Sequence, residues 1–321
     1  MEFKFDPVPF IFKKGDSFTK LCVLEMVDLW NTQLGKDLLL DLLKSQKKDG
    51  GFPSKIDQSL SGVKETERTA NLLLKCKMPK DGLVLMACMR FLLRNQTEDG
   101  GFRESAKLVI PPEAVELSNQ KSVTWLTADM VDLLRQIGQE NSKPCQKAIN
   151  WLRRMEISEG GWGLFEEDDQ IDPDSSAQIT FLMKDLLGGE DTLYKRGIAL
   201  FEKHLDQRAE EANAGFWDRK GEKEEIEVYH LTHLLGQSIF SGKRVADAGY
   251  NIKDKRVKKL LEAIIAIQRE DGGFRPFWSK KSDPLHTGLV LKIFLWAGAM
   301  GKKKIKSMIQ QIVFDSGRSN S

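Results

Sequence analysis

Two aspartates stand two positions apart in the stretch DPDSSA, residues 172–177. Two carboxyl groups this close do not both ionise readily, so the pKa of one rises and a proton is retained. Apolar surroundings raise that pKa further, and a retained proton is what a general acid needs. Asp172 and Asp174 are therefore the candidate catalytic residues of the chain.

The same stretch also has a structural interpretation. Aspartate followed by proline is typical of a helix start, with the carboxylate as N-cap and proline in the first turn. The sequence repeats this arrangement at Asp283 and Pro284. Asp172 is then explained as a cap, whereas Asp174 is not needed for one. An acidic residue in a first turn is nevertheless favourable to the helix dipole, so both interpretations of Asp174 stay open.

The motif QxxDGGF organises the rest of the chain. It occurs at residues 46–52, 96–102 and 268–274, and shorter variants hold Trp162 and the pair Gly215-Phe216. The copies stand about 50–60 residues apart, which is the spacing of a structural repeat. Each copy follows an apolar helical pattern. We therefore expect the glycines to end a helix with positive φ and the aromatic residue to fold back on that helix.

Apolar periodicity around these turns predicts twelve helices paired into αα-hairpins, and no strand of comparable strength. Each repeat buries its apolar face only against its neighbours, so one continuous array is expected. Six hairpins close naturally into a ring. The predicted fold is all-α, an α6/α6 toroid of two concentric rings of six helices with DGGF or GGW turns. The expected helices are residues 18–30, 34–46, 65–75, 83–95, 122–136, 142–155, 172–187, 191–205, 225–240, 254–268, 283–297 and 302–314.

The predicted domain organisation has three parts. Residues 1–16 form an N-terminal arm, expected to be extended because phenylalanines alternate with other residues at positions 3, 5, 10 and 12. Residues 17–314 form the single toroid domain, and residues 315–321 a flexible tail.

Composition narrows the class of protein. Of 321 residues, 40% are hydrophobic and 30% charged, which is ordinary for a globular chain. The net charge of +2 gives no reason to expect nucleic acid as a partner. No apolar run reaches the roughly 18–20 residues of a spanning helix, and no signal segment is visible. We expect a cytoplasmic protein, with peripheral membrane contact left open by the basic runs at residues 255–259 and 302–306.

With its aromatic variants, QxxDGGF resembles the repeat of the terpenoid cyclase and protein prenyltransferase superfamily, which includes squalene cyclases. The resemblance extends over roughly residues 17–314. It implies an α6/α6 toroid with an apolar central cavity for isoprenoid chains or another apolar small molecule. Prenyltransferases of this superfamily work with a separate helical subunit; for this chain a partner subunit is left open. The motif itself is structural, so it identifies a fold and not a reaction.

Residues 172–177 resemble the DxDDTA motif of class II terpene cyclases, with Ser175 in place of the last aspartate. The resemblance implies that Asp174 protonates an alkene or epoxide, with Asp172 as its neighbour. Aromatic faces would then stabilise the cation. His230 is a further substrate-side candidate, although a satisfied inner-barrel histidine explains it as well. The expected aromatic lining residues are Trp125, Phe181, Tyr229, Phe277 and Trp278.

The DPLHT stretch at residues 283–287 resembles the zinc-binding sequence of prenyltransferase β subunits, with His286 at the ligand position. Glu225 and Glu227 stand where that family has Asp and Cys, and Arg219 stands where it has a diphosphate-binding arginine. Two carboxylates and an imidazole suit Zn²⁺ or a harder ion such as Mg²⁺. The alternatives are a helix-start histidine and a solvated charge run.

Three hypotheses therefore stay open. The first is a cyclase-like enzyme with Asp174 as acid. The second is a metal-dependent, prenyltransferase-like enzyme centred on Glu225, Glu227 and His286. The third is a non-catalytic toroid that binds a lipid or a protein.

Overall fold

The computed structural model of the chain describes residues 1–157, 160–219, 222–225, 231–232, 234–235, 242–276 and 279–318. The side chains of residues 216–219, 222–225, 242 and 313–318 lie outside this description. Over these residues the protein is mainly α-helical, and the predicted all-α class is confirmed. It also has two short antiparallel hairpins that the sequence did not predict: β1 (Phe52–Pro53) with β2 (Ser61–Gly62), and β3 (Phe216–Arg219) with β4 (Glu222–Glu225).

The chain divides into two compact units. One is the continuous segment Leu40–Phe201, and the other combines Met1–Leu39 with Glu202–Ser321. The continuous unit, called the middle unit here, contains the end of α3 (Gln33–Lys44), the β1–β2 hairpin, α4 (Val63–Lys75), α5 (Leu83–Leu93), α6 (Thr124–Gln136), α7 (Lys143–Arg154), α8 (Pro173–Leu187) and the start of α9 (Thr192–Ala214).

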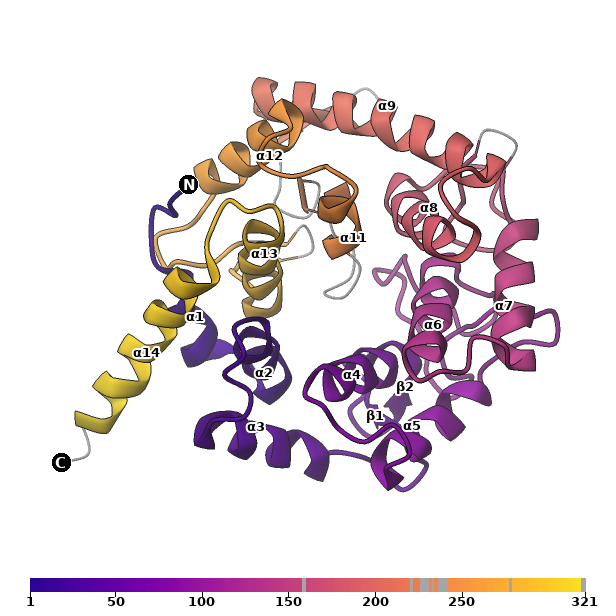
Figure 1. Cartoon of the computed structure of the whole chain (residues 1–321), viewed down its shortest axis with the longest axis horizontal. Helices are drawn as coiled ribbons and strands as arrows, with labels where there is room; N and C mark the ends of the chain where they lie inside the picture. Colours follow the sequence, from indigo (N-terminus) through magenta and orange to yellow (C-terminus); the bar gives the residue numbers. More distant parts are fainter. Residues whose placement is uncertain are drawn as a thin grey trace. The chain divides into compact units, whose positions relative to one another are not determined.

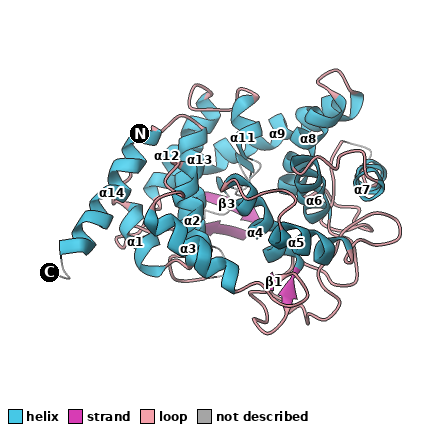
Figure 2. Cartoon of the chain, turned by 60° about the horizontal axis from the view of Figure 1, so that its bottom comes forward, coloured by secondary structure: helices cyan, strands magenta, loops and turns pink. Residues whose placement is uncertain are grey.

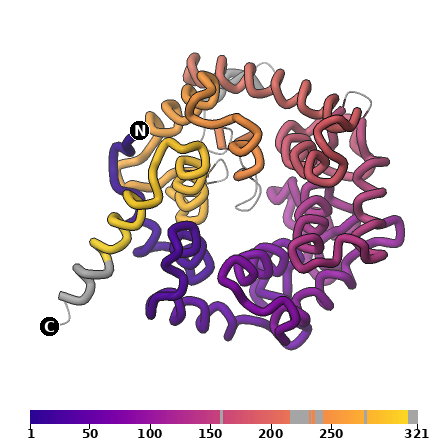
Figure 3. Tube along the Cα trace, in the orientation of Figure 1, coloured from indigo at the N-terminus to yellow at the C-terminus, as the bar shows by residue number. Residues whose placement is uncertain are grey.

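Helices of the middle unit pack in two layers. One layer contains α4, α6 and α8, which lie side by side. In the second layer, α5 packs against α4 and α7 packs against α6 (Figures 1 and 3). The covering helices are those that precede a Gly-Gly turn, and the covered ones are those that follow it. This alternation agrees with the hairpins predicted from the repeat. The closed ring of the expected toroid stays a prediction.

The first glycine of each Gly-Gly turn has a backbone that only glycine adopts readily. Gly50, Gly100, Gly160 and Gly272 have φ of 94°, 113°, 90° and 82°. The turn also lies against the backbone of the next covering helix: a Cβ on Gly100 would lie 2.4 Å from the carbonyl oxygen of Lys147. The predicted positive φ is confirmed, but the glycines do not end the helices, because α5 and α7 already end at their C-caps Arg94 and Met155. The glycine is required for two separate reasons.

The glutamine of QxxDGGF joins consecutive repeats. Gln96 Nε2 donates to the carbonyl of Gly100 in its own turn, at 3.0 Å, and to that of Pro144 in the first turn of α7, at 2.8 Å. Gln46 bonds in the same way to Gly50 and Val84. One side chain therefore fixes both the turn and the position of the following helix.

The second unit combines both ends of the chain. Its helices are α1 (Pro7–Lys14), α2 (Ser17–Met26), the start of α3, the end of α9, α11 (Gly242–Asp247), α12 (Lys255–Ala266), α13 (Pro284–Trp296) and α14 (Lys302–Arg318). α13 packs against α1, α2 and α11, as Figure 2 shows from the side. The Phe3 ring lies against Phe274 and Phe294, with centroids 6.0 and 4.6 Å apart.

The N-terminal arm is not extended along its length as expected. Asp6 accepts a hydrogen bond from the Val8 amide at 2.9 Å and caps α1, with Pro7 in its first turn. Val8 and Ile11 are fully buried, so the segment is helical because one face of it has a core to cover. At the other end α14 continues to Arg318, past the expected boundary at residue 314.

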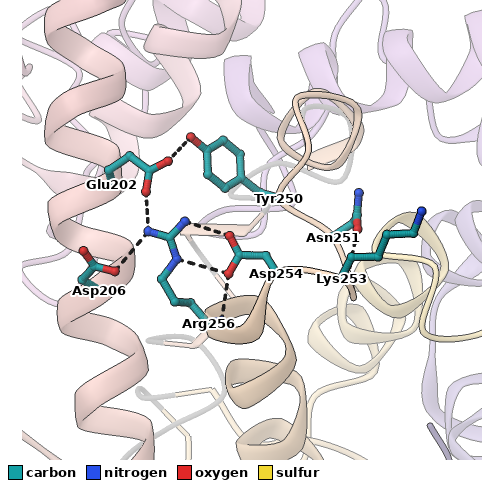
Figure 4. A network of polar contacts seen from close by, with 7 residues as sticks. All are labelled: Glu202, Asp206, Tyr250, Asn251, Lys253, Asp254 and Arg256. Atoms are coloured by element: carbon teal, nitrogen blue, oxygen red, sulfur yellow. Dashed lines mark hydrogen bonds and ion pairs between the residues drawn. The ribbon is translucent and has the colours of Figure 1, made fainter.

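A cluster of charges ties α9 to α12 within the second unit (Figure 4). Arg256 donates to Asp254, the N-cap of α12, at 2.7 Å and to Asp206 of α9 at 3.0 Å. Glu202 accepts from both Arg256 and the Tyr250 hydroxyl. The hydrogen bond from Arg256 holds the pKa of Asp254 below its usual range. Among the described helices, none combines the length and hydropathy of a membrane-spanning segment.

Candidate active site

The DPDSSA stretch opens α8, and its two aspartates have different surroundings. The Asp172 carboxylate accepts from the Ser175 amide at 2.7 Å, so this residue is the N-cap. Asp283 caps α13 in the same way, by accepting from the His286 amide at 2.8 Å. Asp174 takes no part in the cap, and its Oδ1 atom is shielded from solvent. The cap interpretation therefore holds for Asp172. A catalytic role for Asp174 stays a prediction.

The hydroxyl residues after each Asp-Pro pair belong to the repeat. Ser176 Oγ accepts from the Trp162 amide at 2.8 Å, and Thr287 Oγ1 accepts from the Phe274 amide at 3.0 Å. Thr66 and Thr127 hold Phe52 and Phe102 in the same manner. These hydroxyls accept from the backbone amide of the aromatic residue in each turn. This structural role explains their presence without a catalytic one.

One turn further along α8, Gln178 connects Asp174's helix to α6. Residues four apart lie on one face of a helix, so Gln178 and Asp174 share a face of α8. Gln178 Nε2 donates to Asp129 Oδ1 of α6 at 2.6 Å and to the Trp125 carbonyl at 3.3 Å. Asp129 is 4% exposed. A buried carboxyl group therefore lies where α8 meets α6.

A third carboxyl, Glu67 of α4, is fully buried. Asn71 Nδ2 donates to Glu67 Oε1, and Gln136 Nε2 of α6 donates to Asn71 Oδ1 at 2.7 Å. Two sets of hydrogen bonds thus connect polar side chains of neighbouring helices, one between α4 and α6 and one between α6 and α8. We call Glu67, Asn71, Asp129, Gln136 and Gln178 the buried carboxyl cluster.

Burial shifts the pKa of Glu67 upward. Its pKa is raised well above the usual range, first because burial disfavours the charged form and second because Asp129 adds negative charge nearby. Arg68 acts in the opposite direction, and Asp132 adds a smaller rise. Glu67 Oε2 has no hydrogen-bond partner among the described residues. The site therefore favours a neutral carboxylic acid inside an apolar layer.

Sequence reasoning missed this cluster. Glu67 resembles an acidic residue in a helix's first turn, which is favourable for any helix. The available signal was its spacing: Glu67 and Asn71 are four apart and are followed by Leu72 and Leu73, so a polar stripe borders the apolar face of α4. Asp129 does not belong to any sequence motif that would have indicated its role.

The predicted aromatic lining residues that are described lie in packed positions. Trp125 is 5% exposed, donates from Nε1 to the Glu116 carbonyl at 3.0 Å, and has Lys64 Nζ 5.7 Å from its ring centroid. Phe181 packs edge-on against Phe201, with centroids 5.0 Å apart. Their roles toward a substrate stay predictions.

The structure describes the predicted metal site only in part. His286 Nδ1 lies 2.9 Å from Asp283 Oδ1, at the start of α13. Glu225 and Arg219 lie in β4 and β3, so the helix expected to begin at residue 225 does not begin there; their side chains are not described. Over the described residues no group of three histidine, cysteine or acidic side chains could hold an ion. Outside the described residues lie Glu227, Tyr229, His230, Phe277 and Trp278.

No family model and no curated protein sequence matches this chain. Solved structures do. The type II terpene cyclase MstE from Scytonema is 14% identical, with a TM-score of 0.58 over 89% of this chain and 88% of that one. The same enzyme in complex with geranylgeranyl dihydroxybenzoate has a TM-score of 0.56 at the same identity and coverage. An alpha-amylase from Clostridium perfringens, also 14% identical, reaches 0.55 over 88% and 85%.

These similarities concern the fold. The expected resemblance to the terpenoid cyclases is confirmed at that level, because type II cyclases share this architecture over most of both chains. An alpha-amylase with a similar TM-score shows that the fold alone does not select a reaction. The reaction depends on the side chains that the fold positions.

Proposed function

We propose that this protein is an isoprenoid-handling enzyme that starts a cyclisation by protonating a carbon–carbon double bond. The observation that carries the proposal is the fully buried Glu67 carboxyl group among α4, α6 and α8, whose pKa is raised by burial and by the Asp129 charge. Alkene protonation needs an acid that keeps its proton at neutral pH and is shielded from water. MstE, which shares the fold, is a type II terpene cyclase that binds a geranylgeranyl compound.

Carbohydrate cleavage suits this cluster less well. Glycosidases place two carboxyl groups on either side of a sugar, with room between them for the bond that breaks. Glu67 and Asp129 are 0% and 4% exposed, and the helices around them carry the leucines and valines of the core. An apolar substrate is the better match for such surroundings.

Asp174 remains the candidate proton donor that the motif predicts. Asp172 already caps α8, so Asp174 is left for another role, and one of its carboxylate oxygens is shielded. It shares a helix face with Gln178, which reaches Asp129. The proposal therefore concerns a proton donor on α4, α6 or α8, and Asp174→Asn is the first variant to compare.

The test is incubation in D₂O with squalene, prenyl diphosphates of several lengths and geranylgeranyl dihydroxybenzoate. Protonation by an exchangeable acid should give a cyclic isomer of the substrate that carries a single new deuterium. Glu190→Gln is a suitable control, because the Glu190 side chain is exposed. Recovery of unchanged substrate from every incubation would refute the proposal.

The metal-dependent alternative has one observation in its favour. Contact between His286 Nδ1 and Asp283 orients the imidazole as metal-binding histidines are often oriented. Elemental analysis of the purified protein and of His286→Ala separates the two functions. Stoichiometric zinc that is lost in the variant would favour a prenyltransferase-like enzyme.

A further inference from the structure

We infer that Glu67, paired with Asp129, is the acid that donates the proton in the proposed reaction. The inference rests on the proposed function and assigns it to a residue outside the DPDSSA motif. Glu67 lies on α4 and Asp129 on α6, and the contacts around them determine which oxygen carries the proton.

Hydrogen bonding fixes the orientation of the amides in the cluster. Asp132 Oδ2 of α6 lies 3.4 Å from Gln136 Nε2, and a carboxylate only accepts, so this nitrogen is the donor end of Gln136. Gln136 therefore donates to Asn71 Oδ1, at 2.7 Å. The opposite end of Asn71, Nδ2, is then a donor as well, and it points at Glu67 Oε1.

The consequence is an assignment of the two Glu67 oxygens. Oε1 accepts from Asn71 and is the carbonyl oxygen of the neutral acid. Oε2 is buried without a hydrogen-bond partner among the described residues, and it carries the hydroxyl proton. A buried hydroxyl that no acceptor of the described residues holds can donate to a double bond, which is itself a weak acceptor.

Asp129 acts on Glu67 through its charge. Gln178 donates to Asp129 Oδ1 at 2.6 Å, which positions this carboxyl group. The charge of Asp129 disfavours ionisation of Glu67. Other charges act on Glu67 too: Arg68 of the same helix favours ionisation, and Asp132 of α6 opposes it. Burial and the Asp129 charge together therefore favour the protonated form of Glu67.

The proton balance of the step is simple. The Glu67 O–H bond breaks, and the π electrons of the alkene form a new C–H bond, which leaves a carbocation on the neighbouring carbon and a carboxylate on Glu67. Ring closure consumes further double bonds. The cyclised cation loses a proton to water or a carboxylate, Glu67 regains one, and the net reaction is an isomerisation.

One experiment measures the proton without any substrate. Infrared difference spectra of wild type minus Glu67→Gln isolate the carbonyl stretch of the neutral Glu67 carboxyl group. We expect this band at neutral pH, and its loss only at higher pH than for an ordinary glutamate. In Asp129→Asn the loss should shift to lower pH, because a charge that disfavours ionisation is removed. No band at neutral pH in the wild type would overturn the inference.

Activity supplies the second readout. Glu67→Gln should lower turnover roughly 10²–10⁴-fold, the usual contribution of a general acid. Asp174→Asn should lose less, and circular dichroism confirms that each variant is folded. Full activity in Glu67→Gln beside a loss in Asp174→Asn overturns the inference and leaves the proposed function standing. If the wild type converts no isoprenoid, the proposed function fails, and the infrared titration still decides where the proton lies.

Discussion

A glutamate that folding encloses must exchange its hydration for protein contacts, and Glu67 receives an amide donor on only one of its oxygens. An ionised carboxylate in that position would be poorly satisfied, and Asp129 would repel it. The neutral acid is the form that suits the folded state. Protonation of this single residue is therefore linked to the stability of the protein.

The linkage predicts a pH dependence of stability. Because the pKa of Glu67 is raised in the folded state, its contribution is fully present below the usual glutamate pKa and is lost as pH rises toward the raised value. Wild type should lose about 1.4 kcal/mol per pH unit in that window relative to Glu67→Gln, which has no proton to lose. Urea unfolding of both proteins from about pH 5 to about pH 8 checks this. Parallel pH profiles would contradict it.

Residue roles could be predicted where they depend on local sequence. Aspartate before proline predicts a cap, and both Asp172 and Asp283 are caps. Glu67 could not be identified in this way, because its pKa depends on Asp129, which is far away in the sequence. Asp129 in turn depends on Gln178, 49 residues further along. Burial and partners of this kind arise only when α4, α6 and α8 pack together.

The Gly-Gly turn is the element that sets the distance between neighbouring helices. Its first glycine touches the backbone of the next covering helix, and the glutamine before it bonds to that helix's first turn. Small shifts here would move α5 or α7, and with them the helices that carry the buried carboxyl cluster. The repeat motif therefore contributes to the site without belonging to it.

Gly100→Ala tests this close approach. The change adds both backbone strain at φ of 113° and a Cβ 2.4 Å from the Lys147 carbonyl oxygen, each costing about 1–3 kcal/mol. Gly138→Ala is the matched control, since Gly138 has φ of 84° but nothing within 4 Å of the added atom. Denaturant unfolding should show a larger loss of stability for Gly100→Ala. Equal losses would mean that strain alone matters.

Gln96→Leu tests the hydrogen bonds that connect consecutive repeats. Two part-buried hydrogen bonds, to Gly100 and Pro144, are lost, so unfolding free energy should fall by about 1–3 kcal/mol. Gln146→Leu removes one exposed bond to the Glu140 carbonyl and should cost less. Midpoints of urea unfolding for the two variants provide the comparison, and a larger effect at Gln146 would contradict the assigned role.

Most elements follow from periodicity and turn residues, and the exceptions have identifiable causes. α1 was missed because its apolar face is short and depends on packing, mainly against α13. α9 continues to Ala214, past the expected end at residue 205, because no helix-ending glycine occurs before Gly215. The β1–β2 pair arises because Phe52 is drawn into the core and its backbone aligns with Gly62.

At the scale of the molecule, the sequence predicts one array of similar repeats, whereas contacts define two compact units. Repetition of DGGF predicts what each hairpin looks like. It carries no information on which hairpins form a unit, because that depends on side chains from distant parts of the chain. The contact of α1 with α13 is such a case.

Removal of residues 1–14 should act on one unit. The truncation takes away Val8 and Ile11, both fully buried, and uncovers the side of α13 that α1 protects. Hydrogen exchange should therefore accelerate in α2 and α13 and change little in α6 and α7. Mass spectrometry of peptides from the exchanged protein measures both regions at once. Uniform acceleration throughout would show that the two units unfold together.

The pairing of α1 with α13 also constrains the order of events during synthesis. The middle unit is one continuous segment and can form as soon as Phe201 has left the ribosome. α1 emerges first, yet its apolar face has to wait until Trp296 has been translated before α13 can cover it. Contacts over such separations form slowly, so the nascent chain carries an exposed apolar segment for most of its translation. During that interval a chaperone would be expected to engage the first fourteen residues.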